Sequence, residues 1–333
     1  MTIQTGKPIG GPIGGAAAWR GGDIREDTSW RHPIDGRALA EIDAALAGVA
    51  QRGLDWRDIT RDTFPLPDLS GFLADIADAL ETGPGVVRFT GIPVDRYSED
   101  QLRRLYFGIA CHIGTPVAQN GGRGLMRDIR DSGGKRVDSS GALRWHNDRA
   151  DVVALFCIRK ARAGGLSRIV SAVAIHDAMQ AVRPDLAAIL YDDFHRSTVG
   201  DEVGAEALHY PLPIFATRDG FFTSHYSRTY IEQAQQFDAV PRLTGAQIEA
   251  LDLLQELAEQ LCFEMPIEPG EIQLLNNHII YHSRTAFEDD ATHGLDRLLY
   301  RIWLSMPNSR PLPDNHSVLW GNVEAGALRG GAG

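Results

Sequence analysis

The segment Arg144-Trp145-His146-Asn147-Asp148 places a histidine and an aspartate two positions apart, directly before a long apolar run. On an extended strand, residues i and i+2 point to the same face, so the imidazole of His146 and the carboxylate of Asp148 are expected side by side. A second imidazole from elsewhere in the chain would complete the two-histidine, one-carboxylate set that holds non-haem Fe(II). The spacing therefore predicts part of a metal site on a strand.

A second stretch, Asn276-Asn277-His278-Ile279-Ile280-Tyr281-His282, supplies the candidate for the missing imidazole. His282 stands 136 positions after His146 (282 − 146). Further on, Arg297 and Arg301 are four positions apart, so on an extended strand they share one face. A planar guanidinium can meet a carboxylate with two parallel, charge-assisted hydrogen bonds. This pair is suited to bind a small molecule that carries carboxylate groups.

Each of these features also has a plainer structural interpretation. An H-x-D triplet arises by chance, a lone histidine is more often a core residue than a ligand, and two strand arginines can form surface ion pairs. The order of the features favours the metal site: the triplet precedes an apolar strand, a distant histidine follows, and the arginines come last. The arginines stand among residues that look buried, and buried arginines need partners.

The bulk composition restricts the class of protein. With 333 residues, 43% of them hydrophobic and 23% charged, the chain is an ordinary globular protein. A formal net charge of −11 argues against nucleic acid and anionic membranes as partners. Three widely spaced cysteines without a CxxC pattern argue against a disulfide framework or a zinc ribbon, and favour the cytoplasm. Residues 1–18 lack the apolar core of a signal peptide or a membrane span. We therefore expect a cytoplasmic protein with a small-molecule substrate, and the oligomeric state stays open.

The pattern along the chain predicts one domain with flexible ends. Residues 1–27 and 313–333 are rich in glycine and are expected to be flexible, with a single domain over 28–312. Helices are predicted over 35–49, 70–80, 98–111, 175–191 and 244–263, with Ser98 and Thr244 as the N-caps of the third and the last. Strands are predicted over 86–91, 151–161, 167–173, 213–217, 220–224, 271–275, 279–282 and 298–306. Helices predominate in the N-terminal part of the chain, and the strands that carry the candidate ligands follow them. This order predicts an α+β fold with a mainly β core, namely a double-stranded β-helix (jelly roll) with flanking helices.

In combination, these motifs resemble those of the Fe(II)/2-oxoglutarate-dependent dioxygenases of the taurine dioxygenase-like (TauD/TfdA) superfamily, including clavaminate synthase-like oxygenases. The resemblance runs from about Trp30 to Met306. It implies His146, Asp148 and His282 as the catalytic metal ligands, with Fe(II) as cofactor and 2-oxoglutarate and O2 as cosubstrates. His282 is favoured over His278 because the family ligand stands directly before a sequence such as Ser-Arg-Thr-Ala-Phe.

The resemblance also implies residues for the cosubstrate and the substrate. The turn Gly164-Gly165-Leu166-Ser167 matches the family turn whose hydroxyl, here that of Ser167, helps to hold 2-oxoglutarate. Arg297 would pair with the distal carboxylate of 2-oxoglutarate. Arg301 would lie nearer the substrate, where amino acid oxygenases often bind a substrate carboxylate. The weaker candidates for substrate contacts, for which ordinary loop roles are as good an interpretation, are Gln119, Asn120 and Arg149.

The activity that follows from the resemblance is hydroxylation of an unactivated C–H bond in a small carboxylate-bearing metabolite, such as an amino acid or a derivative, with release of succinate and CO2. The presence of Asp148 disfavours halogenation, because related halogenases have Gly or Ala there. Desaturation or cyclisation of a natural-product intermediate, and a non-catalytic binding homologue, are the alternatives. A metal-dependent hydrolase is disfavoured because it has no use for the two strand arginines. The sequence leaves the substrate and the site of oxidation open.

Overall fold

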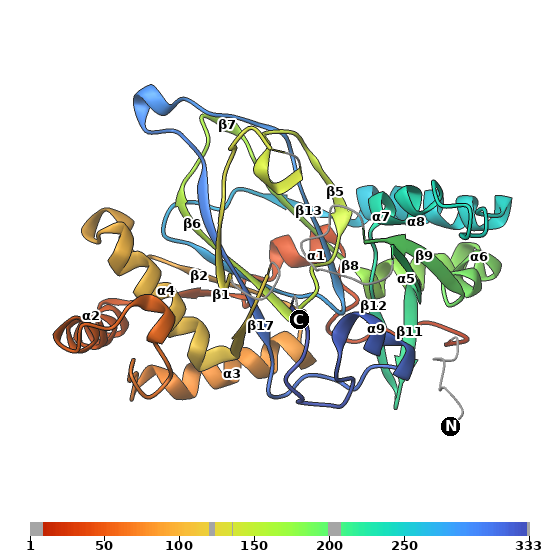
Figure 1. Ribbon diagram of the computed structural model, residues 1–333. Helices are drawn as coiled ribbons and strands as arrows, with labels where there is room; N and C mark the ends of the chain where they lie inside the picture. The colour runs from red at the N-terminus through yellow and green to blue at the C-terminus, as the bar shows by residue number, and fades with distance from the viewer. Residues whose placement is uncertain (1–8, 120–123, 135, 199–207, 332–333) are drawn as a thin grey trace.

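The computed structural model describes residues 9–119, 124–134, 136–198 and 208–331 (Figure 1). The helices of this part are α1 Gly21–Glu26, α2 Gly36–Gln51, α3 Leu69–Thr82, α4 Glu99–Ile113, α5 Ala172–Val182, α6 Pro184–Ile189, α7 Arg228–Ala234, α8 Gly245–Leu261 and α9 Ser317–Trp320. The strands of the first half are β1 Arg31–Pro33, β2 Val86–Thr90, β3 Thr115–Val117, β4 Met126–Ile129, β5 Leu143–His146, β6 Val152–Arg159, β7 Ala163–Gly164 and β8 Ser167–Ser171. Those of the second half are β9 Asp193–Ser197, β10 His209–Pro213, β11 Phe215–Arg218, β12 Phe221–Ser224, β13 Phe263–Met265, β14 Ile272–Asn276, β15 Ile280–Arg284, β16 Phe287–Glu288 and β17 Leu298–Ser305.

Two sheets organise the core. The larger has seven strands in the order β1-β2-β14-β6-β17-β3, and β4 also pairs with β17. The smaller has four strands in the order β13-β8-β15-β5, and all of its pairings are antiparallel. Helices α2, α3 and α4 pack with the larger sheet, and α5, α6 and α8 lie beside the smaller one (Figure 1). The protein therefore has a mixed α/β fold, and the jelly-roll description remains a prediction at this point.

Strand β17 shows how a period of two divides the interior. Leu298, Tyr300, Ile302 and Leu304 belong to the core shared with α2, α3 and α4. Arg301, at an odd position between them, instead lines a pocket whose other walls come from both sheets, with Leu155 on β6 and His282 on β15 among them. Successive strand side chains point to opposite faces, so a strand buried on both sides supplies a packing face and a pocket face. The pocket lies between the two sheets.

The predicted helix over 175–191 is wrong in its start and in its continuity. α5 begins at Ala172, where the side chain of Ser171 caps it by accepting from the Ala174 N–H. The helix ends at Val182, because Arg183 precedes Pro184 and has a non-helical backbone (φ −147°, ψ 70°). Pro184 then opens α6, a position where its missing N–H and fixed φ are favourable.

The predicted caps of two other helices are confirmed. The side-chain oxygens of Ser98 and Thr244 each accept a hydrogen bond from the backbone N–H three residues later. The glutamines at those positions, Gln101 and Gln247, accept in turn from the N–H of the cap residue. The predicted helix over 244–263 is shorter than expected, because α8 ends at Leu261 and Phe263 begins β13. Short pairings that local patterns did not predict include β3, β4 and the β9–β10 hairpin.

The described parts of both chain ends are packed against the domain. Trp19 is buried and its indole N–H donates to the Pro84 carbonyl at 2.8 Å. At the other end, Arg329 is buried and donates from Nε to Asp151 at 2.8 Å. Single large or charged side chains thus anchor the described part of each end, and the flexibility expected from the glycine-rich composition stays a prediction. The boundaries at 28 and 312 stay predictions. Among the described residues, no helix is both long enough and apolar enough to cross a bilayer.

The glycine turn before β8 generates a test of the fold. Gly164 has φ +72°, and a Cβ there would lie 2.1 Å from the Ala286 carbonyl oxygen. Gly294 has a similar φ of +68°, but nothing lies within 4 Å of its Cβ position. Both alanine variants should carry the left-handed strain of about 1–2 kcal/mol. Gly164→Ala should lose about 1–3 kcal/mol more, from the overpacked contact, when unfolding free energies are compared in urea. Equal losses would contradict the close approach of the two chain segments.

Candidate functional site

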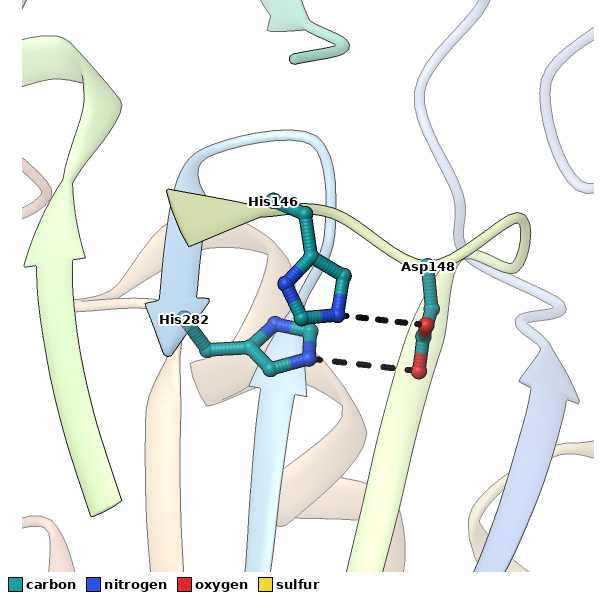
Figure 2. Close-up of side chains that lie close together, drawn as sticks. All are labelled: His146, Asp148 and His282. Carbon is teal, nitrogen blue, oxygen red and sulfur yellow. Dashed lines mark ion pairs between the residues drawn. The ribbon is translucent and has the colours of Figure 1, made fainter. Parts of the chain in front are cut away.

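The two histidines and the aspartate predicted as metal ligands converge at one point (Figure 2). His146 Nε2 lies 3.9 Å from Asp148 Oδ1, and His282 Nε2 lies 4.0 Å from Asp148 Oδ2. These separations are too long for hydrogen bonds. They are within the span of about 4.2 Å that two ligands reach when each lies about 2.1 Å from a common ion. Two neutral imidazoles and one carboxylate are the ligand set of non-haem Fe(II) sites, so the donors fit that metal.

The ladder between β5 and β15 brings the two imidazoles together. His146 is the register partner of His282, and their ring centroids are 4.2 Å apart. The expectation that Asp148 shares a strand with His146 is wrong, since β5 ends at His146. The chain leaves the ladder there because the Asn147 N–H donates to the Tyr226 carbonyl, outside the smaller sheet. Asp148 reaches the histidines from the loop after the strand.

Two asparagines fix that loop. Asn147 Nδ2 donates to the carbonyls of Asn277 and Ile280, and its Oδ1 accepts from the Tyr226 N–H. Asn277 Oδ1 accepts from the Asp148 N–H at 3.1 Å, and its Nδ2 donates to the Ala150 carbonyl. Both side chains are buried. The main chain around the carboxylate is therefore held against the turn that precedes β15.

The carboxylate of Asp148 is buried and ionised. The indole N–H of Trp303 donates to it at 2.9 Å, and Arg301 Nη1 lies 3.3 and 3.4 Å from its two oxygens. Burial raises the pKa of Asp148, but Arg301, the two histidines and the Trp303 bond outweigh it and lower the pKa to about 2. Burial and the neighbouring His146 lower the pKa of His282 to about 3. The site thus presents a carboxylate and a neutral imidazole at neutral pH.

The pocket continues from the three ligands toward a second cationic end. Arg284, Arg297, Arg301 and Ser167 line it together with the metal-ligand residues. Its remaining walls include the apolar side chains Ile129, Val137, Leu143, Leu155 and Ile267. Apolar walls exclude water and strengthen the electrostatic interactions within. The pocket can therefore hold a small anion with one end at the metal site.

Arg297 is the predicted anchor for such an anion. Its guanidinium is buried, and its Nη1 has no hydrogen-bond partner. Burial lowers its pKa to about 10, opposed by Cys157 and Asp289. A Cβ on Gly165 would lie 3.3 Å from Arg297 Cδ and Nε, so the glycine lets the backbone pass close to the arginine. Ser167 lies at the start of β8 and donates from Oγ to Gln273 Oε1 at 3.1 Å.

Of the described residues predicted to contact substrate, only Arg301 lines the pocket. Arg301 lines the pocket, and Gln119 is buried beneath it, accepting from Arg301 Nε at 2.7 Å and donating to the Arg301 carbonyl at 2.8 Å. The Gln119 amide is therefore directed to Arg301. Arg149 is not among the described residues that line the pocket, and its Nη2 donates to the Tyr210 hydroxyl at 3.4 Å. Asn120 lies outside the described residues.

Three neighbouring side chains complete the comparison with the sequence predictions. His278 is buried and bonded to Asp151 at 2.8 Å and to Thr223 at 2.9 Å, away from the ligand set. Arg284 and Trp303 also lie at the site, although neither is predicted there from the sequence. Arg284 could have been found from its position two residues after His282, on the same strand face.

The comparisons with known proteins agree with this geometry. The family model described as "Taurine catabolism dioxygenase TauD, TfdA family" matches residues 51–303. The chain is 28% identical to FR-33289 synthase of Streptomyces rubellomurinus (strain ATCC 31215) over 326 residues, which cover 93% of this chain and 95% of the relative. It is 24% identical to the taurine hydroxylase-like protein SAT17 of Stachybotrys chartarum (strain CBS 109288 / IBT 7711), over 84% of this chain and 76% of the relative.

Solved structures share the fold. An asparagine oxygenase in complex with Fe(II), 2S,3S-3-hydroxyasparagine and succinate superposes with a TM-score of 0.64 at 17% identity, over 83% of this chain and 93% of its own. The non-haem iron oxygenase OrfP in complex with Fe and alpha-ketoglutaric acid superposes with a TM-score of 0.62 at 15% identity, over 83% of this chain and 94% of its own. The family match covers most of the chain, including all three ligand residues. The chain belongs to the taurine catabolism dioxygenase TauD, TfdA family, and its enzyme class is that of the Fe(II)- and 2-oxoglutarate-dependent dioxygenases.

Proposed function

We propose that the protein hydroxylates an unactivated C–H bond of a small carboxylate-bearing metabolite, an amino acid or a derivative, and releases succinate and CO2. The observation that carries the proposal is a single pocket with two imidazoles and a carboxylate at one end and the buried, unpartnered Nη1 of Arg297 at the other. Bound Fe(II) would couple the reduction of O2 to the decarboxylation of 2-oxoglutarate and the oxidation of the substrate.

The residues would divide the work as follows. His146, Asp148 and His282 would hold Fe(II) and leave the remaining octahedral positions for cosubstrates. Arg297 would bind the distal carboxylate of 2-oxoglutarate through its free donors. Ser167 would add a hydroxyl donor if the Gln273 side-chain amide flips by 180°. Gln273 Nε2, which is buried without a partner, would then donate to the Ser167 oxygen and leave the Ser167 hydroxyl proton for the cosubstrate.

The substrate end of the proposal has support from the site and from the relatives. Arg301 is a cation beside the proposed metal position, and its contact with Gln119 fixes its orientation. A substrate carboxylate would bind Arg301, which would also remain paired with Asp148. We also propose Gln119, Asn120 and Arg149 as residues that contribute to substrate binding. The asparagine oxygenase was solved with hydroxyasparagine, and OrfP with (3S)-hydroxy-L-Arg, both hydroxylated amino acids.

We also propose that the two sheets form the double-stranded β-helix predicted from the sequence. The antiparallel strands β5, β8 and β15 in one sheet and β6, β14 and β17 in the other support this arrangement. The pocket between them is lined from both sheets, as a jelly-roll core would require.

The first test concerns the metal. His282→Ala should abolish stoichiometric Fe(II) binding, measured anaerobically by calorimetry, with circular dichroism unchanged. The matched control is His278→Ala, four residues earlier, which should keep the metal but lose stability. Its loss should be about 1.5–3 kcal/mol, since it removes one hydrogen bond to the buried Asp151 carboxylate, which keeps the Arg329 and Met306 donors. Metal binding lost in the His278 variant and kept in the His282 variant would reverse the assignment.

The second test concerns the cosubstrate anchor. Arg297→Ala should weaken 2-oxoglutarate binding by about 10²-fold or more, because a charge-assisted bidentate contact is lost. Arg297→Lys should recover only part of this, since an ammonium keeps the charge without the fork. Binding of 2-oxoglutarate to the anaerobic Fe(II) protein gives the comparison. Unchanged affinity in both variants would place the anchor elsewhere.

The third test concerns the substrate class. Free amino acids and their C-terminal amides should be screened in pairs for stimulation of succinate formation. We expect stimulation by one or more acids and a loss of about 30-fold or more for the matching amide, because a desolvated charge pair is worth about 2–5 kcal/mol when broken. Stimulation by acid and amide alike would remove the proposed role of Arg301, and stimulation only by carrier-bound substrates would redirect the proposal to larger intermediates.

A further inference from the structure

Arg284 is a third buried arginine in the same pocket, beside Arg297 and Arg301, and the roles proposed above do not use it. It stands on β15 two residues after His282, so both side chains point to the pocket face. In the ladder with β8, Arg284 is the register partner of Ser167. Arg284 therefore lies beside the hydroxyl that we assign to the cosubstrate.

The donors of Arg284 are only partly used by the protein. Nη2 donates to the carbonyls of Ser139, at 2.7 Å, and Gly141. Nε and Nη1 are buried and have no partner, and the same holds for Nη1 of Arg297. Unpaired donors on a buried cation are costly, so native proteins seldom leave them unused. These three nitrogens need an acceptor that the described part of the chain does not supply.

The two guanidiniums share one neighbour. The Arg284 and Arg297 Cζ atoms lie 4.6 Å and 5.2 Å from the centre of the Phe287 ring. An aromatic ring attracts cations but accepts no strong hydrogen bond, so it orients the two side chains without satisfying their N–H groups. No described carboxylate forms an ion pair with either arginine. Burial and the neighbouring Arg297 both lower the pKa of Arg284, so the two like charges interact, and an anion bound between them would relieve their repulsion.

We propose that Arg284 and Arg297 together bind the distal carboxylate of 2-oxoglutarate, with Ser167 as the neutral donor beside them. This inference rests on the proposed function and adds a cosubstrate-specificity residue to it. A carboxylate has about four acceptor positions, which is enough for donors from two guanidiniums and a hydroxyl. The pocket therefore selects dicarboxylic 2-oxo acids through two arginines, and Arg284 contributes through Nε and Nη1 while Nη2 stays on the 139–141 backbone.

The test measures the coupling between Arg284 and the distal carboxylate. Binding of 2-oxoglutarate and of 2-oxopentanoate, which has the same chain length but no distal carboxylate, should be measured by calorimetry on the anaerobic Fe(II) protein. We expect Arg284→Gln to weaken 2-oxoglutarate binding by about 10- to 100-fold, as for one or two charge-assisted hydrogen bonds. The variant should change 2-oxopentanoate binding by less than about 3-fold.

Two further variants make the outcome specific. Arg284→Lys retains a donor for the Ser139 carbonyl and should fold even if the glutamine variant does not, with an intermediate loss for 2-oxoglutarate only. Arg168→Gln is the matched control: Arg168 is the register partner of Ser283 in the same ladder, pairs with Glu259, and does not line the pocket. It should leave the affinities for both acids unchanged.

The possible results separate this inference from the function it rests on. An equal loss for both acids in the Arg284 variants would show that Arg284 only supports the 139–141 backbone, and would overturn the inference. A wild-type protein that binds Fe(II) but neither acid would instead overturn the proposed function. Selective loss of 2-oxoglutarate affinity in the Arg297 variant, without such a loss in the Arg284 variants, would leave Arg297 as the single anchor.

Discussion

The site depends on keeping one carboxylate, that of Asp148, ionised inside the protein. Burial of a charge is costly unless it is paired and hydrogen-bonded. Arg301 and the Trp303 indole supply the pairing from β17, and Gln119 holds Arg301 from below through both its amide oxygen and its nitrogen. Mutation of side chains that hold a metal ligand in this way typically costs about 10- to 100-fold in metal affinity or activity. Two side chains of β17, Arg301 and Trp303, therefore stabilise the same carboxylate, that of Asp148.

The same requirement explains why the described C-terminal segment is packed. Asp151, three residues after Asp148, accepts from His278 Nε2, the Met306 N–H and Arg329 Nε, all at 2.8–2.9 Å. Arg329 is also held by the Arg310 carbonyl, and the Gly331 N–H donates to the Arg149 carbonyl at 2.6 Å. The loop that carries the metal ligand is thus fixed on both sides. Residues distant in sequence contribute because a loop cannot orient a buried carboxylate through its own backbone alone.

The sequence predicted well what depends on short-range pattern, and less well what depends on tertiary contacts. The four-residue spacing of Arg297, directly before β17, and Arg301, on it, correctly predicted that both face one pocket, and the caps Ser98 and Thr244 marked real helix starts. The strand was extended too far at Asp148, because the bonds that end β5 come from Tyr226, about 80 residues away. The position of Arg284, two residues after His282, indicates its strand face, but its unused donors become evident only when burial and neighbouring acceptors are known.

The distribution of charge explains how an acidic protein can bind a small anion. The chain has a formal net charge of −11, yet three arginines, Arg284, Arg297 and Arg301, line its pocket together with a single carboxylate, that of Asp148. At physiological ionic strength, exposed charges are screened beyond about 8 Å, whereas buried charges are screened much less. The field in the pocket is therefore set by its own arginines and not by the surface. Buried donors without a protein partner are a local cost, and an anion that satisfied them would bind the folded state only, so its binding would stabilise the fold.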